Sequence, residues 1–192
     1  MAGVSEWVRR FAPLAGQGEV LDLACGGGRH ARHFAALGHA VLALDRDPQA
    51  LQDAAAAGIT TLQFDLEDGV SEWPFGQGRF AAIVVTNYLH RPLFGRLARS
   101  LAPDGVLIYE TFSIGNEAFG RPSNPDFLLH EGELLTLAAF NGLRVIAYED
   151  GVTADPKAAM VQRLCAVGPA FPRSRALLAP QPGRQQRDSS QE

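Results

Sequence analysis

A run of three glycines directly follows a short apolar segment, in residues 22–28 with the sequence DLACGGG. Glycine permits a tight turn and lets a ligand lie directly against the backbone, facing the N-terminus of the next helix. The spacing Gly26-x-Gly28-x-x-Ala31 also matches a dinucleotide-binding fingerprint. A sharp strand-to-helix turn uses the same residues without binding anything. The glycines alone therefore leave a cofactor site and a structural turn both open.

Two aspartates end the next two apolar segments. Asp45 follows residues 40–44, and Asp65 follows residues 59–64. A carboxylate at the first position can accept hydrogen bonds from both hydroxyls of a ribose, and one at the second can accept the exocyclic amine of adenine. Asp45 could instead be an ordinary turn residue, although Asp47 is better placed to cap the next helix. Two acids at successive strand ends behind a glycine turn favour an adenosine-containing cofactor.

The hydropathy pattern supplies the elements that would bring these residues together. Short apolar segments alternate with amphipathic stretches, which indicates an α/β fold of parallel strands with right-handed helical crossovers on both faces. Ligands of such open sheets bind at the carboxyl ends of the strands. We expect strands at 20–24, 40–44, 59–64, 80–86 and 106–110, and helices at 5–14, 29–37, 48–57 and 90–101.

The pattern changes after residue 110. Residues 111–129 are rich in glycine, proline and asparagine and form a long loop, and loops of this length are usually functional or mobile. A short helix and an antiparallel hairpin should follow. These elements are expected at 131–140 for the helix and at 143–149 and 160–167 for the two strands.

Aromatic side chains mark two segments as a possible lid over the substrate. The front segment, residues 1–17, carries Trp7 and Phe11 on one side of its helix. Large aromatic side chains need a partner surface, so the front helix and the 111–129 loop could close together over a ligand. The alternative is that these aromatics complete the core and the loop is static. The loop aromatics are Phe112, Phe119 and Phe127.

Composition sets outer limits on the protein class. The 192 residues, 46% hydrophobic, suffice for a single domain over 1–168, and the Pro/Gln/Arg/Ser-rich residues 169–192 should be a disordered tail. A net charge of −4 argues against a broad nucleic-acid or membrane surface. Two cysteines and the absence of a long apolar run or signal pattern indicate a cytoplasmic protein. We expect a monomer or weak homodimer.

The motifs in combination resemble the class I S-adenosylmethionine-dependent methyltransferases, and most of all a small bacterial branch, the type-11 and tellurite-resistance-like enzymes. The likeness covers roughly residues 18–168. It implies a Rossmann-like, doubly wound seven-stranded sheet ordered 3-2-1-4-5-7-6 with strand 7 antiparallel, and S-adenosylmethionine as cofactor. Ala24 is a departure, since many relatives carry glycine there. The motifs are VLDLACGxG at 20–28, ALD at 43–45, FDL at 64–66 and PDG at 103–105.

The resemblance also implies the cofactor site. Asp45 would hold the ribose, Asp65 with the backbone of Leu66 would bind the adenine, and the glycine segment would line the methionine half. Asn87, which follows the fourth strand, is placed to touch the cofactor. The implied cofactor-binding residues are Asp22, Ala24, Cys25, Gly26, Gly28, Asp45, Arg46, Asp65, Leu66 and Asn87.

Residues for the acceptor are less defined. The segment TNYLH at 86–90 lacks the Asn-Pro-Pro-aromatic motif of methyltransferases that act on DNA adenine or protein glutamine. Tyr88 and His90 could face the substrate, and His90 could act as a base or simply cap a helix. Arg121 could bind an anionic substrate or form an ion pair that ties the loop down. Because no separate domain is available to grip a large substrate, a small-molecule acceptor is favoured.

Two other functions use the same glycine turn. A nicotinamide-dependent short-chain dehydrogenase needs a tyrosine followed four residues later by lysine, whereas Lys157 is the only lysine and lies far from every tyrosine. A protein that binds the cofactor without transferring its methyl group is the other alternative, because fold does not guarantee activity. We expect no metal site, since His30-x-x-His33 lacks a second ligand pair, and Cys25 should be a small turn residue.

Overall fold

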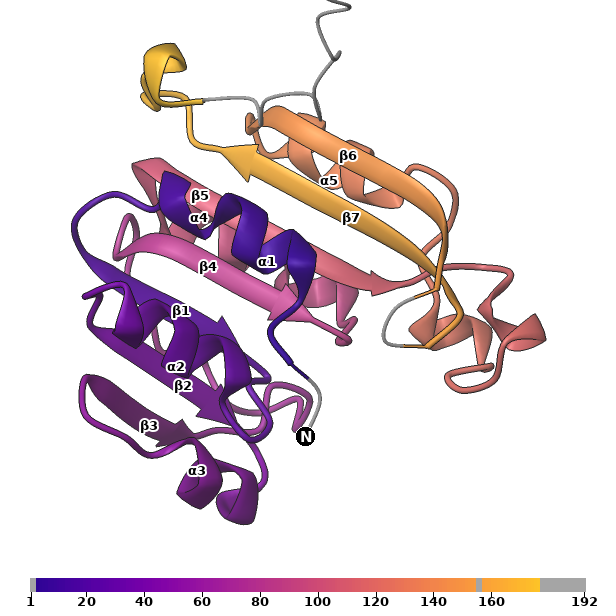
Figure 1. Ribbon diagram of the computed structural model, residues 1–192, viewed down its shortest axis with the longest axis horizontal. Helices are drawn as coiled ribbons and strands as arrows, with labels where there is room; N and C mark the ends of the chain where they lie inside the picture. The colour runs from indigo at the N-terminus through magenta and orange to yellow at the C-terminus, as the bar shows by residue number, and fades with distance from the viewer. Residues whose placement is uncertain (1–2, 155–156, 177–192) are drawn as a thin grey trace, which may run out of the picture.

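The computed structural model describes residues 3–154 and 157–176. The strands of this part of the chain form a single seven-stranded sheet (Figure 1). The strand order is β3-β2-β1-β4-β5-β7-β6, as the family resemblance implied. β1 to β5 pair in parallel, and β7 lies antiparallel to both β5 and β6. The strands are β1 (Glu19–Leu23), β2 (Val41–Asp45), β3 (Ile59–Gln63), β4 (Phe80–Thr86), β5 (Leu101–Phe112), β6 (Arg144–Thr153) and β7 (Ala159–Val167).

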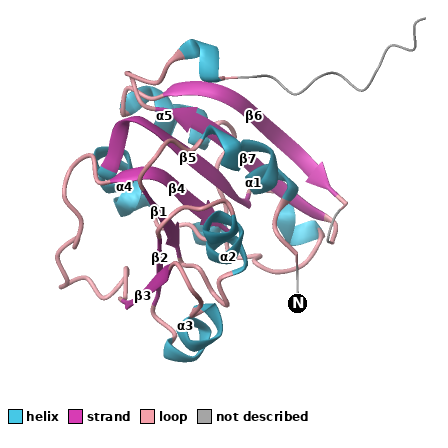
Figure 2. Ribbon diagram, turned by 60° about the vertical axis from the view of Figure 1, so that its left-hand side comes forward, coloured by secondary structure: helices cyan, strands magenta, loops and turns pink. Residues whose placement is uncertain are grey.

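Helices cover both faces of the sheet, in three layers (Figures 1 and 2). Successive strand residues point to opposite faces, so the central strands are apolar throughout. Val20 packs with Phe34 in one core, whereas the adjacent Leu21 packs with Leu97 in the other. The helices are α1 (Glu6–Phe11), α2 (Arg29–Ala36) and α3 (Pro48–Ala54) on the first face, and α4 (Phe94–Ser100) and α5 (Glu133–Phe140) on the second.

The front helix belongs to the first core. The Ser5 hydroxyl caps α1, and Trp7, Val8 and Phe11 are buried. The indole N–H of Trp7 also donates to the carbonyl of Leu164 on β7, at 3.2 Å. The α-helix is shorter than the expected 5–14, and its last turn is a 3₁₀-helix (Ala12–Leu14). Its aromatics therefore fix α1 to the sheet.

Several other boundaries differ from the predicted ones: α3 ends at Ala54 rather than at 57, and β6 extends to Thr153 rather than to 149. The expected helix at 90–101 begins as a 3₁₀ turn, Arg91–Leu93, before α4. β5 begins at Leu101 because this residue already pairs with Phe80, ahead of a register shift between the strands. The 111–129 loop contains two 3₁₀ turns, Asn116–Ala118 and Pro125–Phe127, and a bridge between Ser113 and Leu129.

The chain beyond β7 corrects the predicted start of the disordered tail. Residues 169–176 are packed, because Phe171 is buried and its carbonyl accepts a hydrogen bond from Arg144 at 3.0 Å. Arg175 donates to the Leu14 carbonyl at 2.9 Å. Composition suggested disorder there, but these tertiary contacts hold the segment in place. Residues 177–192, the rest of that predicted tail, lie outside the described residues. Within the described part, no helix has the length and apolar character needed to cross a membrane.

Candidate functional site

The glycine turn after β1 is held against two neighbouring elements. Gly26 and Gly28 have φ values of 50° and 72°, in the left-handed region that favours glycine. The Cys25 N–H donates to the Leu44 carbonyl on β2 at 2.9 Å. A Cβ added at Gly28 would lie 2.5 Å from the Cβ of Ala54 on α3. Gly28 therefore allows α2 and α3 to pack closely.

Asp22 lies beneath this turn, with 1% of its surface exposed. Its carboxylate accepts a hydrogen bond from the Ala31 N–H at 2.8 Å, which fixes the first turn of α2. Burial raises the pKa of Asp22 to about 7, against the opposing effect of that hydrogen bond. The side chain thus positions the turn from below.

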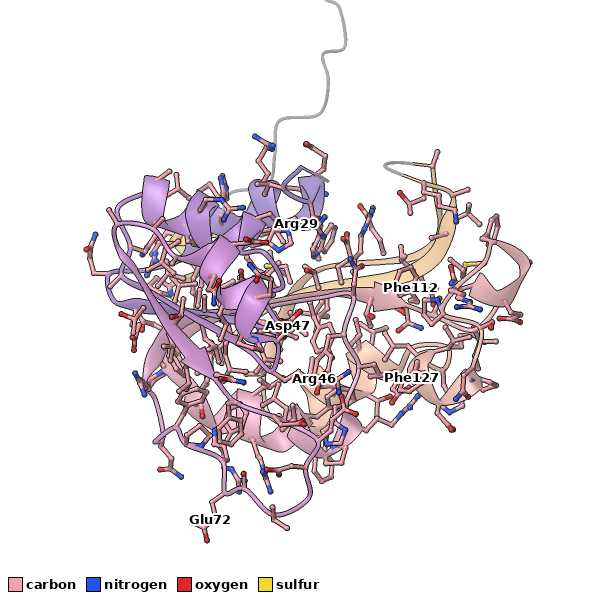
Figure 3. All side chains as sticks on the ribbon, turned by 90° about the horizontal axis from the view of Figure 1, so that it is seen from below. Arg29, Arg46, Asp47, Glu72, Phe112 and Phe127 are labelled. Carbon is pink, nitrogen blue, oxygen red and sulfur yellow. The ribbon has the colours of Figure 1, made fainter. Side chains whose placement is uncertain are left out.

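A cavity of about 400 Å³ opens over the carboxyl ends of the parallel strands. This volume is typical of small-molecule sites. Figure 3 labels three of its lining residues, which are Arg46 directly after β2, Phe112 at the end of β5, and Phe127 in the loop that follows β5. Of the predicted site residues, those lining the cavity are Ala24, Asp45, Arg46, Asp65, Leu66, Asn87 and Tyr88. The predicted residues that do not line it are Asp22, Cys25, Gly26, Gly28, His90 and Arg121.

Asp45 joins the cavity to the glycine turn. One carboxylate oxygen accepts the Gly26 N–H at 2.8 Å, and the other accepts the Asp47 N–H at 3.0 Å. A carboxylate has about four acceptor sites, so capacity remains for two ligand hydroxyls. Asp47 itself caps α3 by accepting the Gln49 N–H at 2.9 Å, as predicted.

Backbone strain is concentrated at the same cavity. Among the described residues, Ala24 and Asn87 are the two non-glycine residues with positive φ, at 53° and 55°. The left-handed conformation costs a residue with a Cβ roughly 1–2 kcal/mol. A glycine at either position would avoid this cost. Such strain gathers at functional sites, because the surrounding structure must hold it.

Tyr88 presents its ring to the cavity, and its buried hydroxyl has no hydrogen-bond partner among the described residues. Burial raises its pKa, and the carboxylate of Glu67 adds to the shift, so the hydroxyl keeps its proton at neutral pH. His90 is half-buried at the start of a 3₁₀ turn, away from the cavity. The structure therefore brings Tyr88, but not His90, to the candidate cofactor site.

Several residues that complete the cavity were not predicted to bind the cofactor, although the sequence marked Phe112 and Phe127 as part of a lid over the substrate. They come from three regions, which are the turn after β3, the segment after β4, and the end of β5 with the loop that follows it. Position at the carboxyl end of a strand was the available signal for Phe64 and Thr111, whereas the folding of the connecting segments brings in Glu67, Leu89 and Pro122. The additional lining residues are Phe64, Glu67, Leu89, Thr111, Phe112, Pro122 and Phe127.

Cys25 is a buried thiol that hydrogen-bonds the Gly26 carbonyl at 3.3 Å. Burial raises its pKa to about 12, and the nearby carboxylates of Asp22 and Asp45 contribute, so it remains a thiol. Within the described ranges, no group of three or more histidine, cysteine, aspartate or glutamate side chains could hold a metal ion.

His30 has a structural role that the sequence did not reveal. It is buried on α2, and its Nε2 accepts the Ser5 N–H at 3.3 Å. Nδ1 therefore carries the proton and donates to the Thr86 hydroxyl, also at 3.3 Å. The ring links the front segment to the end of β4. Burial lowers its pKa to about 3, with Arg29 and His33 contributing.

This histidine should make the fold sensitive to acid. In the folded protein the pKa of His30 is about 3, below its ordinary value of 6.5. Between pH 3 and pH 6.5 the unfolded chain therefore has this histidine protonated, whereas the folded protein does not. Stability should therefore fall as the pH drops below about 6.5, by up to about 1.4 kcal/mol per pH unit. Urea unfolding from pH 7.5 to 5 should show this loss in the wild type relative to His30→Gln. An equal change of unfolding free energy with pH in the two proteins would contradict this prediction. The raised pKa of Asp22 acts in the opposite direction, but it does so in both proteins and cancels in the comparison.

The sheet order, the antiparallel β7 and the cavity over a glycine turn define the class I S-adenosylmethionine-dependent methyltransferase fold. In agreement, residues 20–105 match the family model described as a methyltransferase domain. The resemblance indicated by the motifs is confirmed.

Individual relatives agree with this class. A 2-heptyl-1-hydroxyquinolin-4(1H)-one methyltransferase of Mycobacteroides abscessus is 36% identical over 77 residues, which are 38% of this chain and about a third (34%) of that protein. The structure of TehB from Haemophilus influenzae superposes with a TM-score of 0.69 at 16% identity, over 86% of this chain and 62% of that one. The structure of an S-adenosylmethionine-dependent methyltransferase from Mesorhizobium loti superposes with a TM-score of 0.67 at 19% identity, over 83% of this chain and 95% of that one. At these identities the structural likeness shows the fold.

Proposed function

We propose that this protein is a methyltransferase that uses S-adenosylmethionine to methylate a small molecule. The observation that carries the proposal is the cavity at the strand ends, where Asp45 and Asp65 stand beside the strained residues Ala24 and Asn87. The name of the mycobacterial relative, a methyltransferase of a hydroxyquinolinone, supports a small-molecule acceptor.

The residues that line the cavity fit this cofactor. The spare acceptor sites of Asp45 suit the ribose hydroxyls, and the exposed Asp65 suits the adenine amine. Phe64, Leu66 and Leu89 supply apolar surface for the adenine ring. Ala24 and Asn87 border the space left for the methionine part. When bound, S-adenosylmethionine supplies an electrophilic methyl group on its sulfonium.

The chain's own contribution to methyl transfer is to position the acceptor and exclude water. Phe112 and Phe127 wall the cavity on the side of the 111–129 loop. Because α1 is anchored in the core, any closing movement belongs to this loop and to residues 3–5 ahead of the helix. The two free, buried thiols suit a reducing compartment such as the bacterial cytoplasm.

Calorimetry with S-adenosylmethionine, its demethylated product and NAD tests the assignment. We expect the first two ligands to bind and NAD not to bind, since the sheet order and the match to a methyltransferase domain favour S-adenosylmethionine and the dehydrogenase tyrosine–lysine pair is missing from the sequence. Tighter binding of NAD would overturn the assignment. Binding without methyl transfer to any acceptor in a small-molecule screen would favour a cofactor-binding protein instead.

A further inference from the structure

A second cavity, of about 490 Å³, adjoins the first and shares Asn87 and Phe112 with it. It is bounded by the front segment, the 111–129 loop and the end of the β6–β7 hairpin. Most of the charged side chains that line it are basic. They are Arg9, Arg29, Arg121, Lys157 and Arg163, against the acids Glu6 and Glu110.

Two of these cations are neutralised within the protein. Arg163 pairs with Glu110 at 2.6 Å and with Glu149 at 3.1 Å. Arg9 pairs with Glu6 at 3.3 Å. The other three, Arg29, Arg121 and Lys157, form no ion pair or hydrogen bond with any described residue. Among the described residues, the second cavity therefore carries more positive charge than its ion pairs neutralise, in a chain of net charge −4.

Two of these cations, Arg121 and Lys157, come from segments that lie against each other. A Cβ at Gly120 would lie 3.4 Å from the Lys157 amino nitrogen, so that group lies against the backbone beside Arg121. The buried Asn116 fixes this arrangement. Its amide donates to the Pro122 carbonyl at 2.9 Å and accepts the Met160 N–H of β7 at 3.1 Å. Arg121 is thus on an anchored part of the loop.

Apolar side chains form the other wall of the second cavity. Phe112, Phe119 and Val161 line it, and Phe112 also faces the first cavity. We propose that the methyl acceptor is a small anion with an apolar body, a carboxylate or a phosphate monoester. Arg121 and Lys157 bind its anionic end, with Arg29 adding charge, and its body lies along Phe112 toward the cofactor cavity. This substrate class rests on the proposed methyltransferase function.

The test uses simple probes that share this chemistry. ¹⁵N NMR titrations of the full chain, with and without S-adenosylhomocysteine, would compare benzoate, phenyl phosphate and neutral benzamide. Charge-assisted contacts should make at least one of the anions bind about tenfold more tightly than benzamide. Shifts should appear at Phe112, Phe119 and Val161.

A matched pair of double variants assigns the effect to the second cavity. Arg121→Gln with Lys157→Gln should weaken binding of the anion about tenfold. Arg99→Gln with Arg173→Gln removes the same charge from exposed positions outside the cavity and should leave binding unchanged. Whichever of benzoate and phenyl phosphate binds more tightly shows whether the second cavity prefers a carboxylate or a phosphate group.

The proposal is overturned if no probe binds, if benzamide binds as well as both anions, or if the two double variants behave alike. Failure of S-adenosylhomocysteine to shift the amides of Asp65 and Leu66 would overturn the proposed function instead. The titration of the free protein would still decide whether the second cavity binds anions.

Discussion

Replacing Asp45 by alanine should weaken S-adenosylmethionine binding by about 1.5–3 kcal/mol, or roughly tenfold to a hundredfold, the usual range for hydrogen bonds to a charged group. The carboxylate faces the cavity and has acceptor sites to spare for ribose hydroxyls. It also orders the glycine turn through the Gly26 N–H, so its loss should loosen the backbone against which the cofactor lies. Calorimetric titration measures the change directly.

Asp47 provides the matched control for this experiment. It lies two residues further on and caps α3, but it does not line the cavity. Asp47→Ala should cost about 1 kcal/mol of stability, as the loss of a helix cap usually does, with cofactor affinity unchanged. If Asp45→Ala binds the cofactor as tightly as the wild type, Asp45 is a turn residue and the ribose assignment is wrong.

Residues placed directly at strand ends were the easiest part of the site to predict. Asp45, Asp65 and Asn87 all line the cavity, because the carboxyl ends of parallel strands meet at one edge of the sheet whatever the loops do. The same local reasoning placed Asp47 as the cap of α3. Alternating apolar segments were sufficient for the five parallel strands, and the family resemblance supplied the order of the sheet.

Loop residues were harder, because tertiary contacts decide where their side chains lie. The sequence drew attention to His90, but the neighbouring Arg91 organises the region. Arg91 pairs with Glu133 at 2.6 Å and donates to the carbonyls of Asp126 and Leu128 at 2.9 and 2.8 Å. These contacts join residues far apart in the sequence, and hydropathy does not encode them. They fix the part of the 111–129 loop that brings Phe127 to the cavity.

The glycine motif also did not show which of its residues line the cavity and which only shape the turn. Asp22 and Gly28 belong to the glycine motif as firmly as Ala24 does, yet only Ala24 lines the cavity. The difference depends on what lies behind each residue, α2 for Asp22 and α3 for Gly28. That packing is known only once the sheet and its helices are assembled.

Gly28→Ala should destabilise the fold by about 3 kcal/mol, from a left-handed backbone bearing a Cβ and from overpacking against α3. The added methyl group would lie 2.5 Å from the Cβ and 2.8 Å from the Cα of Ala54, and backbone cannot yield as a flexible side chain can. A domain of this size has only about 5–15 kcal/mol of stability in all, so the loss should be plain in urea unfolding.

Gly27→Ala is the neighbouring control. Its backbone is outside the left-handed region, and its added Cβ would lie 3.8 Å from the Cβ of Asp53, an ordinary contact. Its stability should therefore change by no more than about 1 kcal/mol, because alanine also reduces the freedom of the unfolded chain. Equal stability of the two variants would show that α2 and α3 can separate without cost. If Gly28→Ala then kept its stability but lost cofactor binding, the glycine would serve the ligand rather than the packing of the two helices.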